Sequence, residues 1–279
     1  MTDALTVPGA SEAPLRATAE APLWRQSLEL MWHNRRATLL PMVVTQAPLA
    51  VVAGVAWALL MGRVFPNVAV DQPTALAEDA PNALLACLFA WSWIYALFTL
   101  VGVGGTIVAV AGLAEGQPVK LADALDRPFT RLGAVMALGA IGYLVFVTGV
   151  TGAITVIAPL GAIFVNLKLG TVFQCLLLEN LSVRAAIGKS WNVQKRHLLR
   201  FGGRILTTIP VALLTLVAAI LVFTVLSSPF VSTNPSRAAT VAINAIGIGF
   251  FALAMIPTGA YFATITTLHY LKLRSEPNA

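Results

Sequence analysis

The chain has 279 residues and a formal net charge of +6; 58% of its residues are hydrophobic and only 11% are charged. Soluble domains contain about 45–50% apolar and about 25% charged residues, so this composition and a mean hydropathy of +0.82 exclude an ordinary soluble fold. A membrane is the solvent that fits such a chain.

The N-terminal residues 1–23 are rich in Ala, Pro, Glu and Thr and lack an apolar core before Trp24. They are therefore expected to form a disordered cytoplasmic tail rather than a secretory signal. Residues 24–274 are expected to form one membrane domain, and residues 275–279 a cytoplasmic C-terminal tail.

Long apolar runs follow along the chain, and a bilayer core of ~30 Å needs about 20 helical residues. The turn signal Pro159-Leu160-Gly161 is expected to divide the longest run into two spans joined by a short loop. The sequence thus predicts an all-α integral membrane protein with six transmembrane helices. The predicted spans are 38–62, 83–113, two spans within 132–180, 205–228 and 238–271.

The Lys and Arg residues are distributed unevenly between the predicted connections. Fifteen of the eighteen lie on one side of the predicted membrane, only Arg63 and Arg237 lie on the other, and Lys168 lies within a span. Short connections rich in Lys and Arg stay in the cytoplasm, so both termini are predicted to be cytoplasmic.

One connection, residues 179–204, combines basic and apolar residues at helical spacing. A basic amphipathic helix with Trp on its apolar side can lie among lipid headgroups, so this segment is predicted to be an interfacial elbow that contacts anionic lipids. The predicted headgroup contacts are Arg184, Lys189, Lys195, Arg196, Arg200 and Trp191. Similar segments precede the first and third spans, and "EGQPVKLA" (115–122) partly matches "ENLSVRAA" (179–186), which suggests three repeats of an elbow followed by a transmembrane hairpin.

Two stretches carry a family resemblance: "ENLSVRAAIGKSWNVQKRHLLR" (179–200) and the closing span "PTGAYFATITTLHYLKLRSE" (257–276). The chain resembles bacterial multi-pass proteins related to the membrane domain of glycerophosphoryl diester phosphodiesterases. Ala186, Lys189, Ser190 and Trp191 match the first pattern, and Tyr270, Leu273, Arg274 and Glu276 match the second loosely. The resemblance implies a six-helix architecture in a bacterial inner membrane but no particular function.

The residues that phosphodiester hydrolysis requires are not arranged as a site in the sequence. His33, His197 and His269 each fall at a predicted cytoplasmic end, and none lies beside an acidic pair. No enzymatic activity, metal site, cofactor or nucleic-acid partner is therefore expected. The run "GVGGT" (102–106) lies inside an apolar span, as do Gly247 and Gly249, and close helix packing explains these residues better than nucleotide binding.

Lys168 is an ionisable residue within a predicted span, and Thr171, Cys175 and Glu179 follow it on one helical line. Either Lys168 extends its stem outward to the headgroups, or these four residues line a polar cavity. Pro257-Thr258-Gly259 could likewise be a structural kink or the broken helix of a transporter site.

The preferred interpretation is a non-catalytic multi-pass membrane protein, a scaffold or assembly factor that engages lipids and a partner membrane protein. The alternative is a transporter or lipid-handling protein that uses the polar cavity near Lys168.

Overall fold

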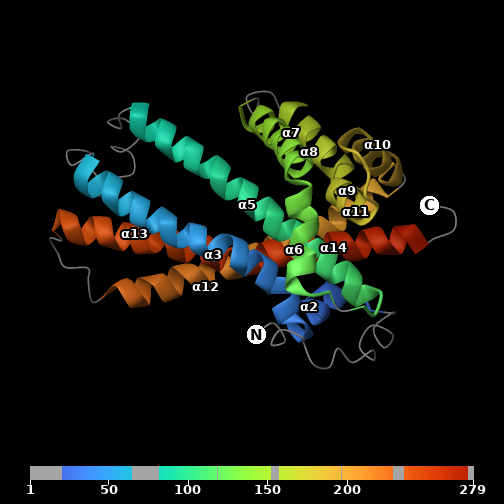
Figure 1. Ribbon diagram of the computed structural model, residues 1–279, viewed down its shortest axis with the longest axis horizontal. Coiled ribbons are helices and arrows are strands. Elements are labelled where there is room, and N and C mark those ends of the chain that lie inside the picture. Colours follow the sequence, from blue (N-terminus) through green and yellow to red (C-terminus); the bar gives the residue numbers. More distant parts are fainter. Residues whose placement is uncertain are drawn as a thin grey trace.

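A computed structural model of the chain describes residues 21–64, 82–117, 119–151, 157–195, 197–228 and 236–275. Every regular element within these residues is a helix, which confirms the all-α class (Figure 1). The elements are α2 (Leu23–His33), α3 (Arg35–Leu59), the π-helical turn η1 (Leu60–Val64), α5 (Asn82–Ala114), α6 (Leu121–Thr130), α7 (Leu132–Thr151), α8 (Ile157–Lys168), α9 (Val172–Leu178), α10 (Val183–Val193), α11 (Leu198–Leu206), α12 (Thr208–Ser227), α13 (Arg237–Ala254) and α14 (Ile256–Ser275).

Four helical stretches in the described part of the chain are long and apolar enough to cross a membrane, and a fifth is added if the bent pair α6 and α7 counts as one. The four stretches are Arg35–Val64, Ala90–Ala114, Leu198–Ser227 and Arg237–Ser275. They contain the predicted first and sixth spans and overlap most of the predicted second and fifth spans. The region predicted to hold the third and fourth spans is more irregular.

Within that region, Pro159-Leu160-Gly161 does not form a turn between two spans, as predicted, but lies in the first turns of α8. Proline is tolerated there because the first N–H groups of a helix have no intrahelical acceptor. A second difference follows at Lys168, where α8 ends, since α9 begins only at Val172. The predicted fourth span is therefore divided into two short helices.

The last two helices, α13 and α14, form one stretch of 39 residues interrupted at Met255, two residues before Pro257. At ~1.5 Å per residue this stretch is ~58 Å long, about twice the thickness of a bilayer core. The second half of α14 also buries polar side chains, among them Thr266, Thr267 and His269. The stretch therefore extends well beyond a single crossing.

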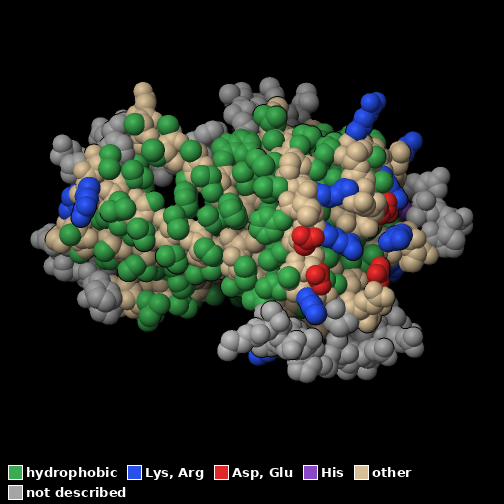
Figure 2. Space-filling view, viewed as in Figure 1, with side chains coloured by type: hydrophobic (Ala, Val, Ile, Leu, Met, Phe, Trp, Pro, Cys, Tyr) green, Lys and Arg blue, Asp and Glu red, His purple; other side chains and the backbone are tan. Residues whose placement is uncertain are grey.

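Charge and apolar surface occupy different parts of the molecule. Figure 2 shows Lys and Arg side chains gathered over the end that contains α10, α11 and the C-terminal end of α14, while hydrophobic side chains cover most of the rest. We call this charged region the basic end. At the opposite end Arg237 begins α13 and donates a hydrogen bond of 2.9 Å to the carbonyl of Met61.

The glycine run of α5 packs closely against two other helices. A Cβ at Gly102 would lie 2.4 Å from Thr45 Oγ1 of α3, and one at Gly104 would lie 2.9 Å from Pro128 Cβ of α6. The absence of side chains at these positions lets the helices approach, which confirms the packing role predicted for "GVGGT".

Three short helices, α2, α6 and α10, each precede a longer apolar helix or helix pair and share an extended N-cap residue. Each buries one face against protein: Leu30 of α2, Leu125 of α6 and Ala186 of α10 are buried. α10 differs from α2 and α6, because the short helix α11 separates it from the long apolar helix α12.

Candidate functional site

Lys168 lies at the C-terminal end of α8 and is only 5% exposed. Its ammonium is 5.6 Å from the ring centre of Phe164 and 5.5 Å from that of Trp191 in α10. Aromatic rings attract a cation at this range through their negative faces. The charge of Lys168 thus lies beside two aromatic side chains that also contact each other.

The break between α8 and α9 is joined to α10 by two hydroxyl groups. Ser190 donates a hydrogen bond of 2.8 Å to the carbonyl of Lys168, one of the last carbonyls of α8. Since Ser190 has only one hydroxyl proton, Thr171 is the donor in the 3.1 Å bond between its Oγ1 and Ser190 Oγ. Both side chains are fully buried. The carbonyl of Lys168 and the hydroxyl of Thr171 are therefore both bonded to α10 at the break.

Glu179 ends α9 and accepts hydrogen bonds from Lys189 of α10 and Tyr270 of α14. Burial raises the pKa of the Glu179 carboxyl, but these two hydrogen bonds and the charge of Lys189 lower it more, so the pKa lies below its ordinary value of 4.5. The carboxylate thereby connects three helices. Cys175, one turn before it, is fully buried.

Arg131, between α6 and α7, closes the turn from α9 to α10. Its Nη1 donates to the carbonyls of Leu176 (3.1 Å) and Leu181 (2.7 Å), and its Nη2 donates to that of Asn180 (3.1 Å). Asn180 has a φ of 57°, a left-handed conformation that Asn adopts more readily than most residues. The guanidinium thus satisfies carbonyls where α9 ends.

The residues predicted to contact lipid headgroups differ in their surroundings. Arg184, Lys195 and Arg200 are exposed, and so are Lys189 and Trp191, although Lys189 also pairs with Glu179 and Trp191 also packs beside Lys168. Arg196 lies outside the described residues. The most exposed large apolar residue next to these cations is Leu199, at 90%.

The structure brings the four residues of the predicted polar line, Lys168, Thr171, Cys175 and Glu179, to one place, the junction of α8, α9 and α10. It does so through a broken helix, and three of them make polar or cation–π contacts to α10. These contacts hold helices together. The described residues contain no group of three or more His, Cys, Asp or Glu side chains that could hold a metal ion.

Arg131 was recognised in the sequence only as one of many cations, although it makes three hydrogen bonds at this junction. Its acceptors lie 45 to 50 residues away in the chain. These acceptors are backbone carbonyls. Every residue has one, so the residue types in the sequence do not show which carbonyls bind Arg131.

Comparison of the chain with protein-family models, with curated proteins and with solved structures found no match. The resemblance to the membrane domain of glycerophosphoryl diester phosphodiesterases therefore stays a prediction.

Proposed function

We propose that the chain is a non-catalytic scaffold or assembly factor of a bacterial inner membrane, which holds a partner membrane protein against α12 and anionic lipids against the basic end. In this proposal the chain crosses the membrane six times, with α7 and the α8–α9 pair as the third and fourth spans and both termini in the cytoplasm.

The observation that carries the proposal is the exposure of α12. Only 6% of an apolar 18-residue segment within Leu198–Ser227 is buried inside the molecule. The corresponding segment within Ala90–Ala114 is 67% buried. Leu214 and Val225 are 73% and 70% exposed. Helices in a membrane associate through packing rather than through exclusion of water, so a helix with so little packing has nearly its whole surface available to a partner helix.

Lipid contact is supported by the exposed part of α10 and α11. Leu199 projects from the surface next to the exposed Arg200, and Arg184 and Lys195 are exposed nearby in the chain. An apolar side chain flanked by cations fits the boundary between anionic headgroups and acyl chains.

The test places a photo-crosslinking amino acid at Leu214 or at Leu221 of α12 in the full chain expressed in a bacterial membrane. We expect both positions to capture the same membrane protein, and the double variant Leu214→Ala, Leu221→Ala to lose its co-purification. Leu144 of α7, 63% exposed, is the matched control because it is equally apolar and accessible. Adducts with lipid alone from α12, or the same captured protein from Leu144, would contradict the proposal.

The alternative function, transport through a polar cavity near Lys168, is not supported by the contacts of that residue, whose ammonium lies against two aromatic rings. Transport stays a prediction, which thiol labelling of the variant Lys168→Cys can test.

A further inference from the structure

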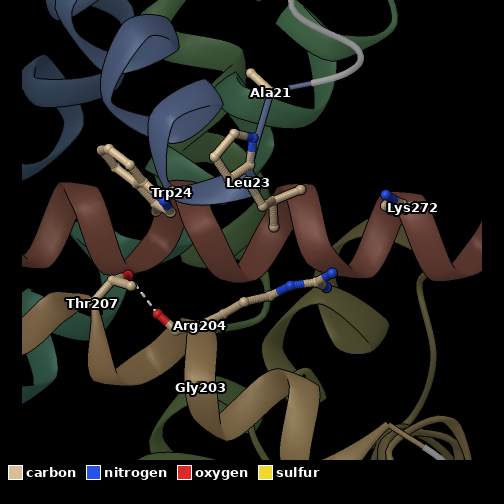
Figure 3. Close-up of a pocket in the computed structure, with 8 residues that line it drawn as sticks. Ala21, Leu23, Trp24, Gly203, Arg204, Thr207 and Lys272 are labelled. Atoms are coloured by element: carbon tan, nitrogen blue, oxygen red, sulfur yellow. Dashed lines mark hydrogen bonds between the residues drawn. The ribbon is translucent and has the colours of Figure 1, made fainter.

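An open pocket of about 410 Å³ lies in the basic end, between the start of α2, the end of α11 and the last turns of α14 (Figure 3). Figure 3 shows Leu23 and Trp24 on one side of α14 and Arg204 and Thr207 on the other, with the Arg204 side chain extended along α14 toward Lys272. The lining residues are Ala21, Pro22, Leu23, Trp24, Gly203, Arg204, Thr207 and Lys272.

The described residues of the lining carry positive charge. Arg204 and Lys272 come from different helices and converge on the pocket, and none of the described residues that line it is Asp or Glu. The α2 helix also begins here: no side chain caps its N-terminus at Pro22, and its first turn has no acidic residue. The first N–H groups of a helix carry partial positive charge, which adds to the two cations.

Buried neighbours fix the position of Arg204. Its Nη1 donates to Nδ1 of His269, a side chain only 1% exposed, and the His269 ring stacks on Phe201 with ring centres 4.9 Å apart. The hydroxyl of Thr207 donates a 2.6 Å bond to the carbonyl of Arg204. His269 thus acts as a positioning residue for the guanidinium. A guanidinium held in this way loses less freedom when it binds an anion.

The pocket lies next to the start of an exposed apolar helix, which indicates that the anion it binds belongs to a lipid. Arg204 and Thr207 come immediately before Thr208, where the exposed apolar helix α12 begins. Trp24, which lines the pocket, is 46% exposed, and Leu206, the last residue of α11, is 60% exposed. Trp residues and the ends of apolar helices are typical of headgroup depth in a membrane. A lipid with its headgroup in the pocket could lay its acyl chains along α12.

We propose that this pocket binds a phosphate group, supplied by an anionic phospholipid headgroup, with Arg204 and Lys272 as its charged contacts. Guanidinium and ammonium groups are the usual partners of phosphate, and a helix N-terminus favours it further. The site is separate from the exposed cations of α10. Its binding of phosphate does not depend on whether α12 binds a partner protein.

The test titrates the delipidated full chain, in a non-ionic detergent, with short-chain phosphatidylglycerol, short-chain phosphatidylcholine and inorganic phosphate, with bound lipid counted by native mass spectrometry. We expect saturable binding of one phosphatidylglycerol, weaker binding of phosphatidylcholine, and a loss of about fivefold in affinity for Lys272→Gln and for Arg204→Gln. Lys272 is exposed, so its variant is expected to fold even if Arg204→Gln does not.

The matched control is Arg127→Gln, which removes one charge from an exposed position of α6 outside the pocket. It is expected to weaken binding by less than about twofold, because screening limits the influence of distant exposed charges. Full affinity in both Lys272→Gln and a folded Arg204→Gln, or an equal loss in the control, would overturn the site. Phosphatidylcholine bound as tightly as phosphatidylglycerol would also overturn it. Inorganic phosphate bound as tightly as phosphatidylglycerol would support a phosphate site but overturn the lipid as its source.

Discussion

Phe201 of α11 fills the space in which a side chain at Gly170 would lie: a Cβ built on Gly170 would be 2.0 Å from Cε1 of the Phe201 ring. The ring is 1% exposed and also stacks on His269. It therefore has little room to move. The break between α8 and α9 is thus the point at which α11 packs against α8.

Gly170→Ala is expected to destabilise the protein by about 1–3 kcal/mol, the usual cost of forcing extra atoms into a packed core. Thermal unfolding of the detergent-solubilised chain measures this loss. Gly188→Ala in α10 is the control, since a Cβ there meets no atom within 4 Å and should be neutral or slightly stabilising. Equal melting temperatures for the two variants would contradict the packing of Gly170 on Phe201.

Arg131→Gln is expected to lower the free energy of unfolding by about 2–3 kcal/mol, because carbonyls at the end of α9 lose a charged donor. The exposed Arg127, three residues before the end of α6, provides the control variant Arg127→Gln, which removes the same charge. Chemical unfolding in mixed micelles compares the two. A loss of similar size in both would show that net charge, and not the hydrogen bonds of Arg131, is responsible.

Much of the fold could be predicted from the sequence because apolar length and charge position are local properties. The long apolar runs became α3, α5, α12 and the α13–α14 stretch, and "GVGGT" became a close packing surface. The break after Lys168 could not be predicted in this way. Gly170 and Thr171 sit within an otherwise apolar run, and the Ser190 hydroxyl that satisfies the freed groups is 19 residues from Thr171 in the chain.

The amphipathic pattern of α10 was recognised, but its apolar side packs on α9, with Ala186 fully buried. Helical periodicity shows that a face is apolar and does not show whether lipid or protein covers it. The aromatic contacts of Lys168 could not be predicted for a similar reason. An aromatic residue such as Trp191 suits a membrane interface and a contact with a cation equally well.

Lys168 provides the decisive test between a structural role and transport. In a background without Cys87 and Cys175, Lys168→Cys is expected to be protected from a small membrane-impermeant thiol reagent applied to either face, because Lys168 is 5% exposed. Trp191→Ala should increase its reaction rate by removing one covering ring. Arg184→Cys, at an exposed position, is the positive control. Rapid labelling of Lys168→Cys with Trp191 in place would restore the case for a water-filled path.

The orientation proposed for the chain can be tested with reporter fusions. Fusions after Arg274 and within the connection that contains α10 are expected to report the cytoplasm, because fifteen of the eighteen Lys and Arg residues lie on that side of the predicted membrane. A fusion at Gln72, which lies outside the described residues, is expected to report the exterior. A cytoplasmic signal at Gln72 would overturn the proposed number of spans or their direction.

Glu179→Gln is expected to lower stability by about 1.5–3 kcal/mol at pH 7, because Lys189 and Tyr270 lose a charged acceptor while the shape of the side chain is retained. The pKa of Glu179 is lowered in the folded protein, so its contribution is complete above the ordinary value of 4.5 and disappears as pH falls through the folded value. The difference between the wild-type chain and the variant should therefore shrink in strong acid. Melting curves from pH 7 down to pH 3 measure this difference.

Glu29→Gln, which removes the exposed pair with Arg25, is the control and should cost only about 0.3–0.5 kcal/mol. A difference for Glu179→Gln that stays constant over this pH range would show that the charge of the carboxylate does not hold α9, α10 and α14 together.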